Sequence, residues 1–178
     1  MPFVPPDLDE LCSQHFRWRD LIQCGETWLR LASQGTPVAN LPQQSETWNG
    51  IRGVAMVLLD PLADQFGKIE VTYAFVGAEL SRHIKRRIAP GVDQHAGSEL
   101  RKDGGLICPR RGQAVDLRAP EVPRDVVVRY IRTQINFDRL YTYDGSETIH
   151  CSVGPQNSAL IYAMSRSTNG RLIPRLVR

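Results

Sequence analysis

The chain has no long apolar run, although 42% of its 178 residues are hydrophobic. No stretch approaches the ~18 consecutive apolar residues that a membrane-spanning helix needs. The N-terminus, MPFVPPDLDE, has no basic segment followed by an apolar one, so we expect no signal peptide. We therefore expect a protein that is made in the cytoplasm, with release by another route left open.

Paired cysteine motifs are also missing, which argues against a disulfide-stapled scaffold. There is neither a C-x-x-C pair nor a high cysteine density, and we expect reduced thiols at all four positions: Cys12, Cys24, Cys108 and Cys151. The net charge is only +3, too small to indicate an anionic partner by itself. A nucleic-acid-binding role would rest on that charge and on the run Lys85, Arg86 and Arg87, so we rank it last.

What remains fits one domain, with helices first and strands with helices afterwards. We expect a short helix in HFRWRDLIQC, and a longer helix from an N-capping Ser45, with a kink at Pro61 and an end at Gly67. GAELSRHIKRRI predicts another helix. PRDVVVRYIRTQI predicts a helix with Pro123 in its first turn. Residues 33–44 and 89–111 have the composition of loops.

Strand patterns occupy most of the second half. IEVTYAF and AVDLR predict strands, DRLYTY and TIHCSV predict a hairpin that turns at Asp144-Gly145, and ALIYAM predicts a last strand. At least one antiparallel pair together with the helices predicts an α+β protein, with a small, mostly antiparallel sheet and helices packed on it.

Four residues carry metal-site chemistry: His95 in DQHAGSEL, Asp116 in GQAVDL, and Glu147 and His150 in ETIHCSVGP. Imidazole nitrogens and a carboxylate oxygen are good zinc ligands, and three protein ligands leave a position for water. A free carboxylate nearby would accept that water's proton.

Each residue also has an ordinary interpretation. His95 in a polar loop is, taken alone, a surface histidine, and His150 between Ile149 and Cys151 fits a core histidine. Glu147 fits a turn. Asp116 is harder to explain in this way, because an ionised carboxylate in an apolar strand must be paired, hydrogen-bonded or bound to metal.

The segments GQAVDL and ETIH contain G-x-A-x-D and E-x-x-H. They resemble the zinc D-Ala-D-Ala carboxypeptidases and L-Ala-D-Glu endopeptidases of the hedgehog/DD-peptidase fold, whose pattern is S-x-H-x-x-G-x-A-x-D followed by E-x-x-H or H-x-H. FRWRDLIQCGETW, NLPQQSETW and VLLDPLADQFGKIEVTYAF are similar to the flanks of compact bacterial and phage members. The resemblance implies that His95, Asp116 and His150 bind zinc and that Glu147 is the general base.

The same resemblance implies a substrate, an amide bond in a D-amino-acid peptide such as a peptidoglycan stem peptide. We expect an N-terminal extension over 1–15, one zinc-peptidase-like domain over 16–164 and a segment over 165–178 that is either a tail or docked on the domain. We expect no membrane partner.

Two positions depart from the family pattern. Asp93 stands where the family has serine, and the family's S-G-Y-R-S aligns with Tyr73 to Gly77, which has no arginine. Arg82, Arg110 and Arg111 are candidates to replace that arginine, which stabilises the developing oxyanion in the family. The alternative to an enzyme is a domain that keeps the zinc site but serves as a peptide- or protein-binding module.

Overall fold

A computed structural model of the chain describes residues 3–84, 90–168 and 172–177. Six strands form one sheet in the order β1-β2-β4-β3-β5-β6. All neighbouring pairs are antiparallel except β3 and β5, which are parallel. The strands are β1 (Glu70–Tyr73), β2 (Gln113–Arg118), β3 (Arg139–Tyr143), β4 (Ile149–Val153), β5 (Leu160–Arg166) and β6 (Leu172–Val177). The predicted α+β class with a mostly antiparallel sheet is therefore confirmed.

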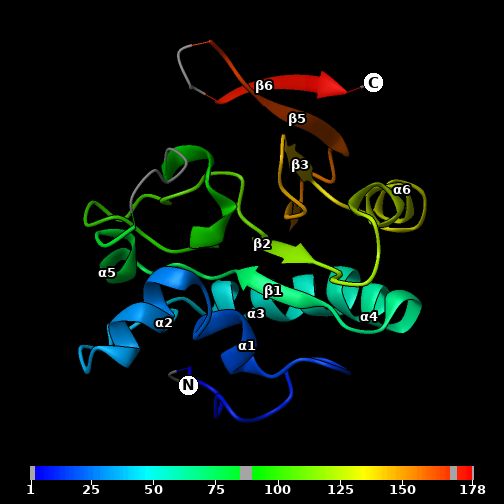
Figure 1. Cartoon of the computed structure of the whole chain (residues 1–178). Coiled ribbons are helices and arrows are strands. Elements are labelled where there is room, and N and C mark those ends of the chain that lie inside the picture. The colour runs from blue at the N-terminus through cyan, green and yellow to red at the C-terminus, as the bar shows by residue number, and fades with distance from the viewer. Residues whose placement is uncertain (1–2, 85–89, 169–171, 178) are drawn as a thin grey trace.

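Helices precede and flank this sheet, and Figure 1 shows α3 and α4 running beside β1 and β2, with α6 next to β3. Contacts join α3 to both β2 and β4. Within the described part of the chain, no helix has the length and apolar character needed to cross a membrane. The helical segments are α1 (Trp18–Ile22), α2 (Glu26–Ser33), α3 (Ser45–Val54), η1 (Ala55–Leu59), α4 (Asp60–Phe66), α5 (Ala78–Ser81), η2 (Pro90–Val92), η3 (Gln94–Ala96) and α6 (Arg124–Gln134).

The predicted long helix is present as the continuous run of α3, η1 and α4. Its middle segment, η1, is a π-helical turn that ends two residues before Pro61, the second residue of α4. A wider turn accommodates a proline ring that would clash with a regular helical turn. Gly67 ends the run with φ 77°, as expected. Ser45, however, is not the N-cap: it lies inside the helix, and its hydroxyl donates to Glu46.

The two faces of the sheet differ because side chains alternate along each strand. One face packs on the helices and belongs to the main core, with buried Val115, Leu117, Leu140, Ile149, Cys151 and Ile161. The other face presents Asp116, His150, Tyr141 and Tyr162 to a cavity. The polar residues of the sequence motifs therefore lie on the sheet face away from the helical core.

Other expectations were met in part. The β3–β4 hairpin is present, but α2 was not predicted as a separate element, and α5 is only four residues long where a longer helix was expected. Residues 85–89, including the basic run, lie outside the described residues. Pro123, expected in the first turn of a helix, is the N-cap directly before α6. The predicted loop over 89–111 contains η2 and η3.

Described residues near both ends of the chain contact the rest of the protein. In the predicted N-terminal extension, Leu8 packs against the main core and Cys12 is buried in it. In the C-terminal segment, β6 pairs with β5 from Leu172 to Val177. The C-terminal segment was expected to be either a tail or docked on the domain, and residues 172–177 are docked on it.

Candidate metal centre

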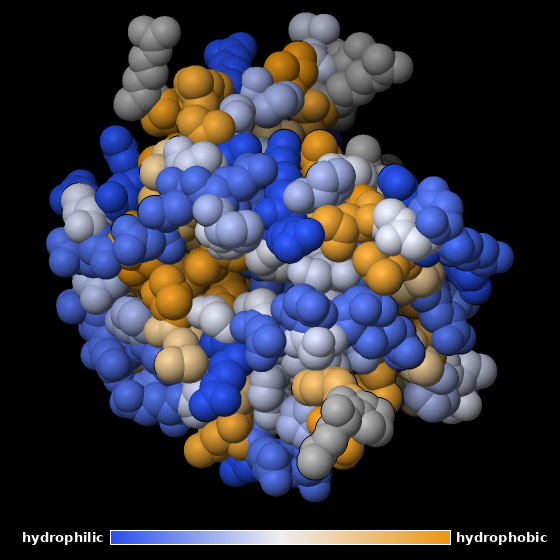
Figure 2. All heavy atoms as spheres, turned by 180° about the vertical axis from the view of Figure 1, so that it is seen from behind, coloured by the Kyte–Doolittle hydropathy of each residue, from blue (hydrophilic) through white to orange (hydrophobic). Residues whose placement is uncertain are grey.

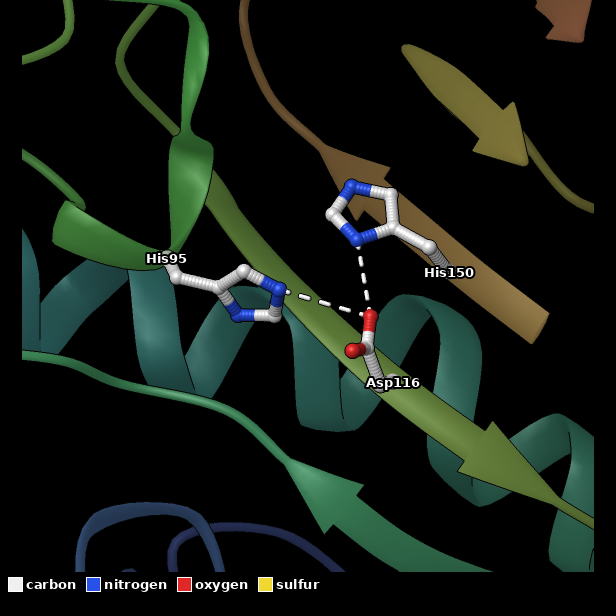
Figure 3. A group of neighbouring side chains, drawn as sticks. All are labelled: His95, Asp116 and His150. Carbon is white, nitrogen blue, oxygen red and sulfur yellow. Dashed lines mark hydrogen bonds and ion pairs between the residues drawn. The ribbon is translucent and has the colours of Figure 1, made fainter. Parts of the chain in front are cut away.

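Three segments that are distant in sequence bring His95, Asp116 and His150 together (Figure 3). His95 comes from η3, Asp116 from β2 and His150 from β4. One ligand atom from each residue can be chosen so that all three lie within 4.8 Å of one another. Asp116 Oδ1 is 3.4 Å from His95 Nε2 and 2.8 Å from His150 Nδ1. Both histidines are buried, whereas the Asp116 side chain remains 24% exposed.

His95 is held at both its backbone and its ring. Its carbonyl accepts from Val76 N at 3.0 Å, and its N–H donates to the Asp93 carboxylate at 3.0 Å. Its Nδ1 is 2.8 Å from the Ala74 carbonyl, which can only accept, so Nδ1 carries the proton. This tautomer leaves Nε2 facing Asp116. A backbone carbonyl that orients the far nitrogen in this way is typical of metal-binding histidines.

The G-x-A-x-D motif places Asp116 through backbone packing. Gly112 has φ 71°, and a Cβ there would lie 2.2 Å from the Val153 carbonyl oxygen, so only glycine fits. This close approach brings the start of β2 against the end of β4. Ala114 is fully buried two residues before Asp116, and β2 contacts η3 at this end. The small residues of the motif thus allow the segment carrying His95 to pack against the strand carrying Asp116.

His150 is aligned with Asp116 by the sheet itself. The two residues are direct partners across β2 and β4, and Tyr141 is the partner of His150 on β3. The Tyr141 ring lies edge-on to the His150 ring with centroids 5.1 Å apart. Cys151 points to the opposite face and is buried in the core, as strand alternation predicts. Its pKa is raised by burial, so it is an unreactive thiol.

Charge attraction dominates the electrostatics of the cluster. Burial disfavours the charged form of each group, but the Asp116 carboxylate outweighs this effect at His95 and raises the histidine's pKa. For Asp116 the same desolvation is outweighed by the His95 charge and the His150 hydrogen bond, which hold its pKa well below the ordinary range. Asp116 is therefore ionised at neutral pH and supplies the negative charge that a cation needs.

The donor set fits a metal ion. Two nitrogens and one carboxylate oxygen match the ligands found in catalytic zinc sites. Two ligands of a tetrahedral zinc lie ~3.4 Å apart, close to the 3.4 Å from His95 Nε2 to Asp116 Oδ1, whereas the 2.8 Å from Asp116 Oδ1 to His150 Nδ1 is a hydrogen bond that a metal would replace. The cluster His95, Asp116 and His150 can therefore hold a metal ion.

Glu147, the fourth residue of the sequence hypothesis, is not brought to this cluster. It is exposed, and its carboxylate accepts from the backbone N–H of Arg124 at the start of α6. Thr148, which follows it, lines the cavity beside His150. Glu147 itself does not line the cavity. Its role as a general base stays a prediction that this conformation does not favour.

The cluster lies in a cavity of about 750 Å³ that also contains charged residues. Asp93 and Glu26 line it, and Arg110 is the only lysine or arginine that does so among the described residues. Of the three arginines considered as replacements for the missing one, Arg110 is therefore the one at the site. Its guanidinium also donates to the Val92 carbonyl.

Four cavity tyrosines were missed by the sequence analysis: Tyr73, Tyr141, Tyr143 and Tyr162. Tyr73 lies edge-on to His95 with ring centroids 4.6 Å apart. A signal was present in DRLYTY, where Tyr141 and Tyr143 alternate and therefore share a face. That His150 lies on the same face of the sheet follows only from the register between β3 and β4, which the sequence does not show.

Comparison of the chain with protein-family models, with curated proteins and with solved structures finds no match in any of the three.

Proposed function

We propose that the protein is a zinc-dependent hydrolase that cleaves an amide bond, and that it is a divergent relative of the zinc D-Ala-D-Ala carboxypeptidases with the hedgehog/DD-peptidase fold. The observation that carries the proposal is the convergence of His95, Asp116 and His150 in one cavity. A zinc ion at such a site polarises a carbonyl group and acidifies water. By the sequence resemblance, the substrate is a D-amino-acid peptide such as a peptidoglycan stem peptide.

A general base must lie within hydrogen-bond reach of the proton that it accepts, and a carboxylate inside the cavity can fill this role. Asp93 meets this condition better than Glu147, because Asp93 lines the cavity and is hydrogen-bonded to the backbone of His95. Its second carboxylate oxygen is free of that bond. Arg110 is the cavity cation that would stabilise negative charge developing on the substrate oxygen.

The experiment that tests the proposal combines metal content with hydrolysis. Purified protein should contain close to one zinc per chain, and it should cleave stem peptides ending in D-Ala-D-Ala. Asp93→Asn should lower kcat by at least ~100-fold, in the range that general base catalysis contributes. Glu147→Gln should have little effect on kcat. The reverse result would restore Glu147 as the base, and the absence of zinc would contradict the metal site.

A binding module remains the second candidate function. It is favoured by the position of Glu147, whose carboxylate contacts α6 rather than the metal cluster. Zinc at one equivalent without cleavage of any stem peptide would support this alternative.

A further inference from the structure

A row of paired residues continues from the metal cluster across the sheet. Asp116, His150, Tyr141 and Tyr162 are successive partners on β2, β4, β3 and β5. Directly paired residues project from the same face of a sheet, so the two tyrosines stand beside the ligands. The rings of Tyr141 and Tyr162 are stacked, with centroids 5.0 Å apart and planes inclined by 16°.

A second row lies two residues further along the same strands. Tyr143 on β3 is paired with Met164 on β5, and Met164 is paired with Pro174 on β6. All three line the cavity. We call the four residues Tyr141, Tyr143, Tyr162 and Met164 the tyrosine wall. It forms a flat, largely apolar side to a cavity that is otherwise polar near the metal cluster.

The tyrosine wall is open to solvent at one side. Its members are only partly buried, and neighbouring Leu172 is 44% exposed. Figure 2 shows further apolar side chains gathered over the β5–β6 hairpin. Apolar surface of this kind gains free energy when a ligand covers it.

The spacing of the strands sets how far from the metal cluster a ligand group on the tyrosine wall would lie. Neighbouring strands are ~4.8 Å apart, so the wall begins one strand from His150 and extends roughly 5–10 Å from it. A group held there would be attached a few bonds away from the atom at the metal. Aromatic rings suit a wall of stacked tyrosines, because offset and edge-to-face ring pairs add to the free energy of area burial.

We infer that the tyrosine wall is a binding subsite for an aromatic side chain of the substrate, close to the amide bond presented to the metal. The inference rests on the proposed function and deepens it by naming the substrate class. A subsite for D-alanine alone would need no such surface. Among the amides and D-amino-acid peptides that the proposed function allows, the protein would then prefer one with an aromatic residue beside the scissile bond over a stem peptide with only alanine there.

The test uses two hydroxamates on the zinc-loaded protein, acetohydroxamate and 3-phenylpropanohydroxamate. Both compounds carry the hydroxamate that binds metal, but only 3-phenylpropanohydroxamate has a phenyl ring. We expect the phenyl compound to bind roughly 10-fold tighter by calorimetry. With methyl-labelled methionine, it should shift the NMR signal of Met164 and leave that of Met56 unchanged, because Met56 lies in η1, away from the cavity. Equal affinities for the two compounds would overturn the inference.

Variants locate the subsite. Tyr162→Ala should reduce the preference for the phenyl compound to within roughly 2-fold, with zinc content and acetohydroxamate affinity unchanged. Tyr143→Ala should act in the same direction if the first variant does not fold. Tyr130→Ala is the matched control, since Tyr130 stacks edge-on with Phe66, and neither residue lines the cavity. A preference that survives both wall variants would contradict the inference.

The failure of the metal site can be distinguished from the failure of the wall. If no zinc binds, 3-phenylpropanamide and acetamide replace the hydroxamates and are added to the metal-free protein. A shift of the Met164 signal with the phenyl compound alone would support the wall without the metal. No shift with either compound would overturn the wall.

Discussion

Asp116 and His150 face each other across β2 and β4, with Oδ1 and Nδ1 2.8 Å apart. Their alignment follows from strand register, so neither residue depends on a flexible loop for its position. His95 is the exception, because it reaches the pair from η3. Two rigid ligands and one loop-borne ligand make the hydrogen bonds around His95 decisive for metal affinity.

Removing either histidine should remove the metal. His95→Ala and His150→Ala each delete one of three ligands, and we expect zinc content to fall from about one per chain to near zero after dialysis. His15→Ala is the matched control, because His15 is paired with Asp64 on the surface and does not line the cavity. Elemental analysis decides the outcome. Full zinc content in either cluster variant would exclude this ligand set.

Stability should depend on pH in opposite ways with and without metal. The folded-state pKa of His95 is raised, so its charge contributes stability that is complete below the unfolded value of ~6.5 and is lost as pH rises through the folded pKa. Asp116, with a lowered pKa, contributes stability above its unfolded value of ~3.9 and loses it as pH falls through its folded pKa. The ion pair is therefore fully effective between these two unfolded values.

Without metal, the stability contributed by the His95 charge declines as pH rises. Zinc should reverse this decline above neutrality, since metal ligands must be deprotonated. Melting temperatures measured from pH 5.5 to 8.5 should show a gain on zinc addition that grows with pH. With EDTA present, the contribution of the His95–Asp116 pair should decline over the same range. His95→Gln should abolish the zinc-dependent gain. A gain that is constant with pH would argue against ligation by these histidines.

The sequence predicted the metal cluster better than the surroundings of that cluster. His95, Asp116 and His150 could be named because together they resemble the ligand pattern of a zinc-peptidase family, although only Asp116 was hard to explain otherwise when taken alone. Glu147 could not be placed, because it lies in the turn before β4, where no periodic pattern shows the direction of a side chain. Tyr162 was invisible for a related reason: β5 pairs in parallel with β3, and such long-range register is not encoded in local patterns.

For the fold as well, features set by nearby residues were easier to predict than features set by contacts between distant segments. The long helix over residues 45–66 was readable from its apolar spacing, whereas the role of Ser45 was not, because the helix begins at Ser45 itself and the preceding Gln44 is the N-cap. The β6 strand carries apolar residues but remains exposed, so burial gave no pattern to recognise. The β3–β4 hairpin could be predicted from its strand pattern and turn residues, whereas β6, which has no buried face, could not.

Gly112→Ala should disrupt both folding and metal binding. A Cβ there meets the Val153 carbonyl oxygen at 2.2 Å, and the residue has φ 71°, so we expect a loss of roughly 3 kcal/mol in the free energy of unfolding. Gly145→Ala is a matched control, because Gly145 has φ 73° but nothing within 4 Å. That variant should lose only ~1–2 kcal/mol, the cost of the left-handed backbone conformation. Urea denaturation measures the free energy of unfolding of both variants. Equal losses in Gly112→Ala and Gly145→Ala would show that the close approach of β2 and β4 is unimportant for stability.

Arg110→Ala should separate binding of metal from turnover. Arg110 lines the cavity but is not a member of the metal cluster, so zinc content should be unchanged. If its guanidinium stabilises negative charge on the substrate oxygen, kcat should fall by ~100-fold, as for the loss of one oxyanion donor. Arg82→Ala serves as the control, since Arg82 follows α5 and does not line the cavity. A fall in kcat for Arg82→Ala alone would assign the role to the other arginine, and a rise in KM without a fall in kcat would make Arg110 a binding residue only.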